Sequence, residues 1–190
     1  IKAHYENLES RKAELEELIL ALAAPYQQEL AILQTAPGIS SDFTAIGIIS
    51  EIGTNMEAFP SAKHLCSWAG LTPTNNESAG KKKSVRVSKA GCYIKPLLVQ
   101  CANAVVKSTK HPEMRNRYLR LKKRRGHKKA IIAIARMLLT ALYHMLKNGE
   151  NYNAELYQKS DLLPVDREIT VEQALMIARN QGYKIKSATA

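Results

Sequence analysis

The first 24 residues place apolar side chains at a regular helical spacing. Two positions recur every seven residues over three heptads, the a/d spacing of a coiled coil: Tyr5, Lys12 and Ile19, then Leu8, Leu15 and Leu22. Lys12 interrupts this seam. The pattern predicts one amphipathic helix over residues 2–24, with two interpretations open. It is an arm that pairs with another chain or an upstream helix, or a helix packed on its own domain.

Helical periodicity continues beyond this segment and predicts a mainly α protein. Ser88 can cap one of the helices, and Pro96 should kink that helix or mark its first turn. A polar stretch rich in Asn, Gly and Lys, residues 71–88, is expected to be a loop. The only candidate strands are 84–87 and 183–185. The expected helices span 25–35, the stretch ending at Gly53, 61–70, 88–106, 112–125, 127–147 and 170–182, the last with a Thr170/Gln173 capping box.

A tight turn, Ala36-Pro37-Gly38-Ile39-Ser40-Ser41, separates two of these helices. A helix, a Pro-Gly-Ile turn and a second helix resemble a helix-hairpin-helix element, in which hairpin amides and a helix N-terminus accept a DNA phosphate. Such elements usually have a second glycine where this chain has Ser40. Gly38 is therefore a candidate DNA contact, and a purely structural helical hairpin is the alternative.

Charge is concentrated in one window of the chain. Residues 81–130 contain 17 Lys and Arg and a single acid, Glu113, so this window has a net charge of +16. The whole chain has a net charge of +11, so the remaining residues together carry −5. A one-sided field of this size indicates a polyanionic partner, most commonly nucleic acid. Tyr93 and Tyr118 are the only aromatic residues in the window. Phosphate contacts rather than base stacking should therefore dominate binding.

The remaining composition narrows the class of protein. No apolar run approaches the roughly 20 residues of a membrane span, and the polar N-terminus is unlike a secretory signal. Three cysteines without CxxC spacing argue against a disulfide framework and a zinc site, and fit a reducing cytoplasm. The chain begins at Ile1 within a predicted helix, from which we expect a piece of a longer protein.

Three stretches together resemble a known family. They are TAPGISSDFTAIGIISEIG, FPSAKHLCSWAGLTPTNNESAGKKKSVRVSKAGCYIKPLL and KKAIIAIARMLLTALYHMLKNGENYN, which contain G-L-x-P, E-S-x-G and S-K-x-G elements in order. Residues 1–153 resemble the C-terminal half of insertion-sequence transposases related to the Piv DNA invertase. That family joins an N-terminal RuvC-like DEDD domain to a serine-bearing transposase domain, and its members work with a structured bridge RNA that pairs with donor and target DNA.

The resemblance implies a serine nucleophile. The family's serine follows G-L-x-P, which here places the role on Ser78 within Glu77-Ser78-Ala79-Gly80. Its hydroxyl would attack a DNA phosphodiester and hold one DNA end as a phosphoserine, which retains the bond energy for rejoining. Ser78 is followed by Lys81, Lys82, Lys83 and Arg86. These cations are suited to holding the scissile phosphate and to offsetting the negative charge that it gains in the transition state. Ser84 and Ser88 compete for the role, and Pro96 replaces a residue that is usually basic in the family.

A seryl hydroxyl needs a base or a metal, and this sequence offers no convincing one. In the family, four acidic residues of the RuvC-like domain bind divalent metal, which we expect to be Mg²⁺. These residues would lie upstream of Ile1, so the chain itself needs no cofactor and should be inert alone.

The resemblance thus implies a DNA transposase domain guided by RNA. The expected division is a coiled-coil helix (1–24), a serine transposase domain (25–153) and a C-terminal extension (154–190), in a cytoplasmic homo-oligomer that binds DNA and guide RNA. Two alternatives stay open: a non-catalytic helical nucleic-acid-binding module, and a protein-interaction scaffold whose basic face is only solvated. The predicted DNA-binding residues are Gly38, Lys81, Lys82, Lys83, Arg86, Ser88, Lys89, Arg120, Lys122, Lys123, Arg124, Arg125 and Lys128.

Overall fold

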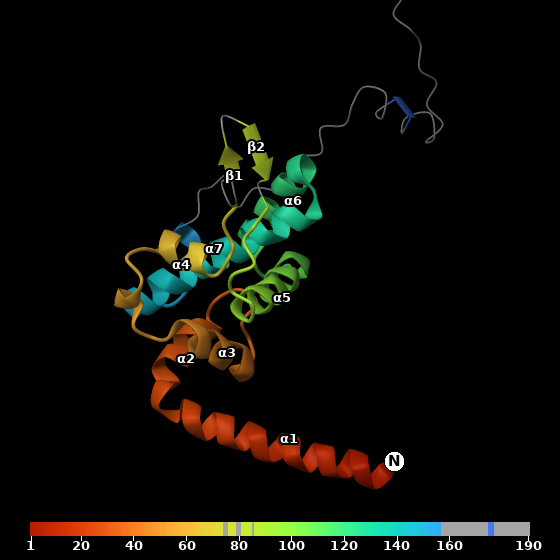
Figure 1. The fold of residues 1–190 in the computed structure, drawn as a ribbon, viewed down its shortest axis with the longest axis vertical. Coiled ribbons are helices and arrows are strands. Elements are labelled where there is room, and N and C mark those ends of the chain that lie inside the picture. The colour runs from red at the N-terminus through yellow and green to blue at the C-terminus, as the bar shows by residue number, and fades with distance from the viewer. Residues whose placement is uncertain (74–75, 79–80, 85, 157–174, 177–190) are drawn as a thin grey trace, which may run out of the picture.

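A computed structural model describes residues 1–73, 76–78, 81–84, 86–156 and 175–176, with backbone alone for 76–78 and 81–84. The prediction of a mainly α protein is confirmed (Figure 1). One short antiparallel hairpin interrupts the helices. The elements are α1 (Lys2–Ala23), α2 (Gln27–Gln34), α3 (Asp42–Ile52), α4 (Ala62–Trp68), β1 (Asn76–Ser78), β2 (Lys81–Ser84), α5 (Ile94–Lys107), α6 (Pro112–Arg125) and α7 (His127–Asn148), with 3-10 turns at Ala24–Tyr26, Met56–Ala58 and Ala154–Leu156.

Helix α7 is the centre of the core and packs against α2, α4, α5 and α6. Its buried side chains recur at helical spacing and include Ile134, Leu138 and Leu142, each fully buried. By length and composition α7 could cross a membrane, but half of its apolar window is buried inside the protein. The sequence reading missed this property because Arg136 interrupts the apolar run. Its burial among four other helices is typical of a core helix.

Helices α5 and α6 complete the body by burying one face each. Helix α5 buries Leu98, Ala102 and Val105, at i, i+4 and i+7. Pro96 is the third residue of α5 and lies in its first turn, which confirms one of the two predicted alternatives. Proline fits there because the first four N–H groups of a helix have no partner within the helix. Helix α6 ends where predicted, at Gly126 with φ +79°.

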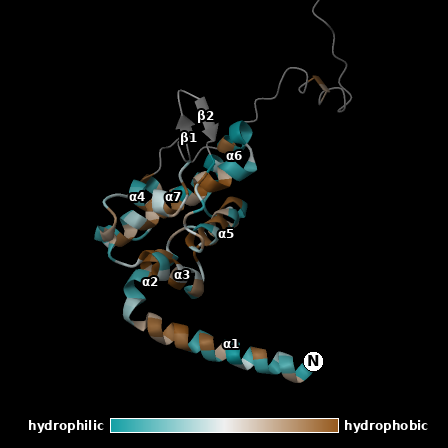
Figure 2. Cartoon of the chain, in the orientation of Figure 1, coloured by the Kyte–Doolittle hydropathy of each residue, from teal (hydrophilic) through white to brown (hydrophobic). Residues whose placement is uncertain are grey.

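Helix α1 projects away from the helical body (Figure 1). Ala23 is its only buried residue, although apolar residues lie along its length (Figure 2). Leu8, Leu15 and Leu22 are 51%, 59% and 68% exposed. Among the described residues the helix therefore does not pack on its own domain. Of the two interpretations left open by the heptads, this exposure favours the arm, and its pairing with another chain or an upstream helix stays a prediction.

Two details of the predicted elements were wrong. Residues 76–78 and 81–84 form strands within the expected loop. Of the candidate strand 84–87, Ser84 ends β2, Val87 forms an isolated bridge with Pro73, and residue 85 lies outside the described residues. Ser88 does not cap α5, which begins six residues later with Tyr93 at its N-cap; its hydroxyl instead accepts a hydrogen bond from the Ala90 N–H at 3.3 Å. The helix predicted at 170–182 and the strand at 183–185 lie outside the described residues, except for residues 175–176, which are helical.

The turn between α2 and α3 packs against α5. A Cβ on Gly38 would lie 2.6 Å from the Cys101 carbonyl oxygen, and φ of Gly38 is +80°, so the turn requires glycine. Asp42, the first residue of α3, accepts a hydrogen bond from the Gln34 side chain and puts a negative charge at this helix N-terminus. The structure gives Gly38 a packing role, and its contact with a DNA phosphate stays a prediction.

Candidate nucleic-acid interface

The β1–β2 hairpin carries the predicted nucleophile. In its antiparallel register Ser78 lies opposite Lys81, and Glu77 lies opposite Lys82. An isolated bridge between Pro73 and Val87 continues the pairing toward the helical body. The backbone thus brings the start of the lysine tract beside Ser78. The side chains of residues 74–85, which include Ser78, Lys81, Lys82 and Lys83, lie outside the described residues.

Two glycines mount this hairpin on the body. The chain enters through residues 70–73 (the entering limb) and leaves through residues 86–91 (the leaving limb). A Cβ on Gly70 would lie 2.4 Å from the Ala90 carbonyl oxygen, and a Cβ on Gly91 would lie 2.3 Å from the Ala69 carbonyl oxygen. The two limbs therefore cross with their backbones in contact, which only glycine permits at these positions.

Lys95 braces the same crossing. Its Nζ donates a hydrogen bond to the Ser88 carbonyl oxygen at 2.5 Å, and its backbone N–H donates to the Gly91 carbonyl oxygen at 3.0 Å. The ammonium also lies 2.8 Å from the point where a Cβ on Gly70 would be. Lys95 thus bonds to the leaving limb from the start of α5 and lies close to Gly70 of the entering limb.

In the leaving limb, two of the predicted DNA-binding residues are placed to contact phosphate and the third is not. Arg86 and Lys89 are exposed, as a cation that binds phosphate must be, and Arg86 already has an interaction within the protein. Ser88 is half-buried, with its hydroxyl used by Ala90 and its carbonyl used by Lys95. Ser88 therefore has a structural role, and its predicted DNA contact stays a prediction.

A second basic region lies where α6 meets α7. Residues 120–129, which we call the basic elbow, span the last turns of α6, Gly126 and the first turn of α7. The region is hydrophilic in Figure 2, and residues 122–129 are all exposed. Arg124, Arg125 and Lys128 form no ion pair with the described acidic residues, so their charge is available to a partner.

A buried tyrosine and a histidine fix the geometry of the elbow. Tyr118 is 8% exposed, and its hydroxyl is hydrogen-bonded to Nδ1 of His127 at 2.9 Å, which joins α6 to α7 across Gly126. The ammonium of Lys122 lies 5.8 Å from the centre of the Tyr118 ring. The elbow is therefore held in part by contacts between α6 and α7.

The one acid of the basic window does not reduce the surface charge. Glu113 is 1% exposed, and its carboxylate accepts a hydrogen bond from the Tyr152 hydroxyl at 3.0 Å. Nδ1 of His111 lies 3.4 Å from the same carboxylate. The Tyr152 N–H in turn donates to the Thr35 hydroxyl, so this cluster ties the segment after α7 to the body. Sequence reasoning counted Glu113 but missed this role.

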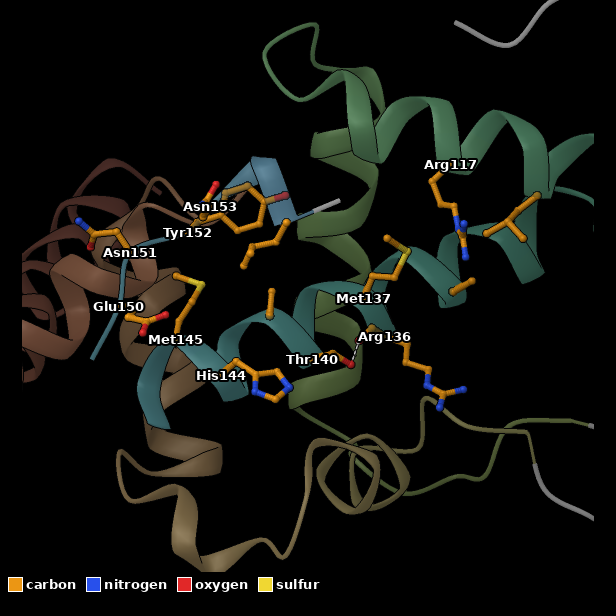
Figure 3. A pocket seen from close by; sticks show the side chains of 14 residues that line it. Arg117, Arg136, Met137, Thr140, His144, Met145, Glu150, Asn151, Tyr152 and Asn153 are labelled. Atoms are coloured by element: carbon orange, nitrogen blue, oxygen red, sulfur yellow. Dashed lines mark hydrogen bonds between the residues drawn. The ribbon is translucent and has the colours of Figure 1, made fainter. Parts of the chain in front are cut away.

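A cavity lined by described residues of the helical body includes none of the hairpin residues. It encloses about 540 Å³ between α6, α7 and residues 150–156. Arg117 and Arg136 lie toward one end and Glu150, Asn151 and Tyr152 toward the other (Figure 3). Met137 and Met145 line the space between them, so most of the wall is apolar. None of the predicted DNA-binding residues lines it.

The described residues contain no group of three or more His, Cys, Asp or Glu that could hold a metal ion. The three cysteines are unpaired; Cys66 and Cys101 are buried and Cys92 is exposed. Burial raises the pKa of the Cys101 thiol to about 11, so it stays protonated and unreactive at neutral pH. The described residues thus offer neither a metal centre nor a thiolate nucleophile in the core.

Comparison with known proteins points to transposases. Residues 30–119 match the model of the Transposase IS116/IS110/IS902 family, a stretch that runs from α2 into α6 and includes the hairpin. Over 127 residues the chain is 29% identical to the "Insertion element IS110 uncharacterized 43.6 kDa protein" of Streptomyces coelicolor, a match covering 66% of this chain and 30% of that protein.

A second relative is a "Pilin gene-inverting protein" of Moraxella bovis. It is 28% identical over 132 residues, which cover 67% of this chain and 40% of that protein. The chain therefore spans less than half the length of either relative. Together these matches support a relationship to IS110-type transposases.

Proposed function

We propose that this chain is the serine-bearing part of a DNA transposase or recombinase, which cleaves and rejoins DNA through Ser78. The match of residues 30–119 to a transposase family carries this proposal, because that stretch contains the whole hairpin. The relative that is named for gene inversion supports DNA rearrangement as the class of reaction. A basic surface of two regions supports DNA as the substrate.

The proposed step is an exchange of one phosphodiester for another. The Ser78 oxygen attacks a DNA phosphorus, a serine–phosphate bond forms, and the bond to one sugar oxygen breaks. The serine proton passes to a base, and the released sugar oxygen gains a proton to become a hydroxyl. Rejoining reverses these changes with a hydroxyl from another DNA end, so the reaction needs no external energy source.

The cations of the hairpin would hold the reacting phosphate, and those of the elbow would hold the flanking backbone. Lys81 lies opposite Ser78 in the register, where a cation can offset charge that develops on the phosphate. Lys82, Lys83, Arg86 and Lys89 follow on the same strand and limb. The elbow would bind the backbone of DNA or of a guide RNA by charge, without reading sequence.

The rest of the machinery would come from outside this chain. A RuvC-like domain of four acidic residues would bind Mg²⁺ and supply the base or the activated oxygen that Ser78 needs. A structured guide RNA would select the DNA by base pairing, and α1 would pair with another subunit through its exposed leucines. The complete protein would act on DNA in the cytoplasm.

A covalent adduct is the direct test of Ser78. The whole protein is incubated with its DNA, guide RNA and Mg²⁺, and protein–DNA adducts are separated under denaturing conditions. We expect Ser78→Ala to abolish the adduct while DNA affinity stays within about threefold, because a hydroxyl contributes little to a surface held by charge. Ser84→Ala, on the paired strand, is the matched control and should form the adduct normally.

Two results would contradict the proposal. A normal adduct with Ser78→Ala would show that another group is the nucleophile. Binding without any adduct in the wild-type protein would favour a non-catalytic nucleic-acid-binding module instead.

A further inference from the structure

The two limbs of the β1–β2 hairpin are anchored unequally. On the entering limb Leu71 is 1% exposed, and its N–H donates to the Cys66 carbonyl oxygen at 2.9 Å, so this limb is fixed in the core beside α4. On the leaving limb none of residues 86–91 is buried, and Lys89 and Ala90 are exposed. The leaving limb therefore depends on polar contacts for its position.

Lys95 supplies a charge-assisted contact that holds the leaving limb. A hydrogen bond from an ammonium to a carbonyl is charge-assisted and stronger than a neutral one, and the bond to Ser88 is short, at 2.5 Å. Ile94, next to Lys95, is fully buried, so the backbone from which the ammonium reaches is rigid. The contact thus joins a limb without buried residues to the buried start of α5.

We infer that Lys95 is a positioning residue for the hairpin: its ammonium holds the leaving limb against α5 and thereby sets the place of Ser78. This inference rests on the proposed function of Ser78. It needs no contact between Lys95 and DNA, because the ammonium acts through the Ser88 carbonyl and the hairpin register. A displacement of about 1 Å in a reacting group can slow a reaction about 100-fold, so a loose limb should affect rate.

The competing explanation is that Lys95 contacts a DNA phosphate. The two explanations predict different effects of a Lys95 substitution on DNA affinity, on its salt dependence and on reaction rate. Loss of a phosphate contact weakens DNA binding and lowers the slope of log affinity against log salt by about 0.9. Loss of a brace slows the reaction of bound DNA and leaves that slope unchanged. A core defect would instead lower the unfolding temperature.

The experiment compares Lys95→Met with Lys107→Met in the whole protein. Lys107 is exposed at the other end of α5, so it provides the same chemical change away from the hairpin. We measure adduct formation at saturating DNA, DNA affinity over a range of salt, and amide hydrogen exchange of residues 86–91. Lys95→Arg is included because a guanidinium can also donate to the Ser88 carbonyl.

We expect Lys95→Met to slow adduct formation about 10- to 100-fold, with unchanged affinity and salt slope and faster exchange in the leaving limb. Lys107→Met should match the wild type, and Lys95→Arg should recover part of the rate. Unchanged exchange, or an unchanged rate despite faster exchange, would overturn the inference. So would a rate loss accompanied by a lower salt slope.

Failure of the proposed function would look different. If the wild-type protein formed no adduct, Ser78 would not be a nucleophile, whatever the exchange data showed. If Lys95→Met did not fold, Lys95→Gln would replace it in the same comparison. The glutamine side chain is uncharged and too short for its amide to reach the leaving limb.

Discussion

The hairpin and the basic elbow both carry net positive charge but are held in different ways. The elbow lies on two long helices joined by the Tyr118–His127 hydrogen bond, and Ala130, the residue after it, is buried. The hairpin is a short strand pair, and the described residues join it to the body where Gly70 and Gly91 cross and where Lys95 donates to Ser88. Along the longest axis both α6 and the hairpin lie far from α1 (Figure 1).

This difference indicates a division of labour. A cation that grips backbone phosphates needs charge and exposure, and tolerates an imprecise position because the attraction acts over several ångströms. A nucleophile needs its position fixed to within a fraction of an ångström. Substitutions of Gly70, Gly91 or Lys95, where the hairpin joins the body, should therefore change the reaction rate. Substitutions in the elbow should change DNA affinity.

The largest effect is expected at the glycine crossing. Gly91→Ala places a Cβ 2.3 Å from the Ala69 carbonyl oxygen, so the two limbs must separate. We expect adduct formation at saturating DNA to fall at least about 100-fold while elbow-driven DNA affinity is kept. Single-turnover adduct assays and salt-dependent binding measure the two quantities.

Gly149→Ala is the matched control for this substitution. Gly149 has the same φ of +66° as Gly91 but nothing within 4 Å of an added Cβ. It shares the backbone strain of about 1 kcal/mol without the overlap. Equal rates for the two variants would show that the crossing does not position the hairpin.

A smaller effect on affinity is expected from the elbow. Replacement of Arg124, Arg125 and Lys128 by Gln should lower the salt slope by up to about 2.7, since each lost phosphate contact accounts for about 0.9. The rate of adduct formation from bound DNA should change less than threefold. Replacement of Lys2, Arg11 and Lys12 in α1 by Gln removes the same charge far from the elbow and is the control. A slower reaction with unchanged affinity would contradict the proposed division.

The smallest effect is expected where the geometry of the elbow is loosened without a change of charge. Tyr118→Phe removes the hydrogen bond to His127 and should lower the free energy of unfolding by about 1 kcal/mol. DNA affinity should stay within about twofold, because the exposed cations remain. Denaturant unfolding and binding titrations give the two values. A large loss of affinity would show that the elbow, like the hairpin, works by precise position.

Most of the helices were predictable because their signals are local. Gly126 and Gly149 end α6 and α7 where the sequence indicated, and Pro96 marks the first turn of α5. The heptads of α1 predicted a helix but not its surroundings. Whether Leu8 or Leu15 meets its own domain depends on the direction that the chain takes after Ala23, which periodicity does not specify.

The candidate site was predictable as a list of residues and not as an arrangement. The resemblance placed Ser78 and its lysines on one segment, but the strands of the hairpin were read as a loop, because lysine and asparagine are poor strand formers. Lys95 was counted only as one of 17 cations. Its bond to Ser88 joins residues on either side of a glycine turn, and no spacing rule reveals such a contact.

The amino-acid sequence by itself determined the helices, their ends and the sign of the surface, since propensity, caps and charge act over a few residues. Tertiary packing alone decided that Glu113 is buried while the cations around it are exposed, and that no described helix covers the length of α1. It also decided that Gly38, Gly70 and Gly91 each face a carbonyl oxygen of a distant or neighbouring segment. These are properties of close approach between segments, which depend on how the whole chain folds around α7.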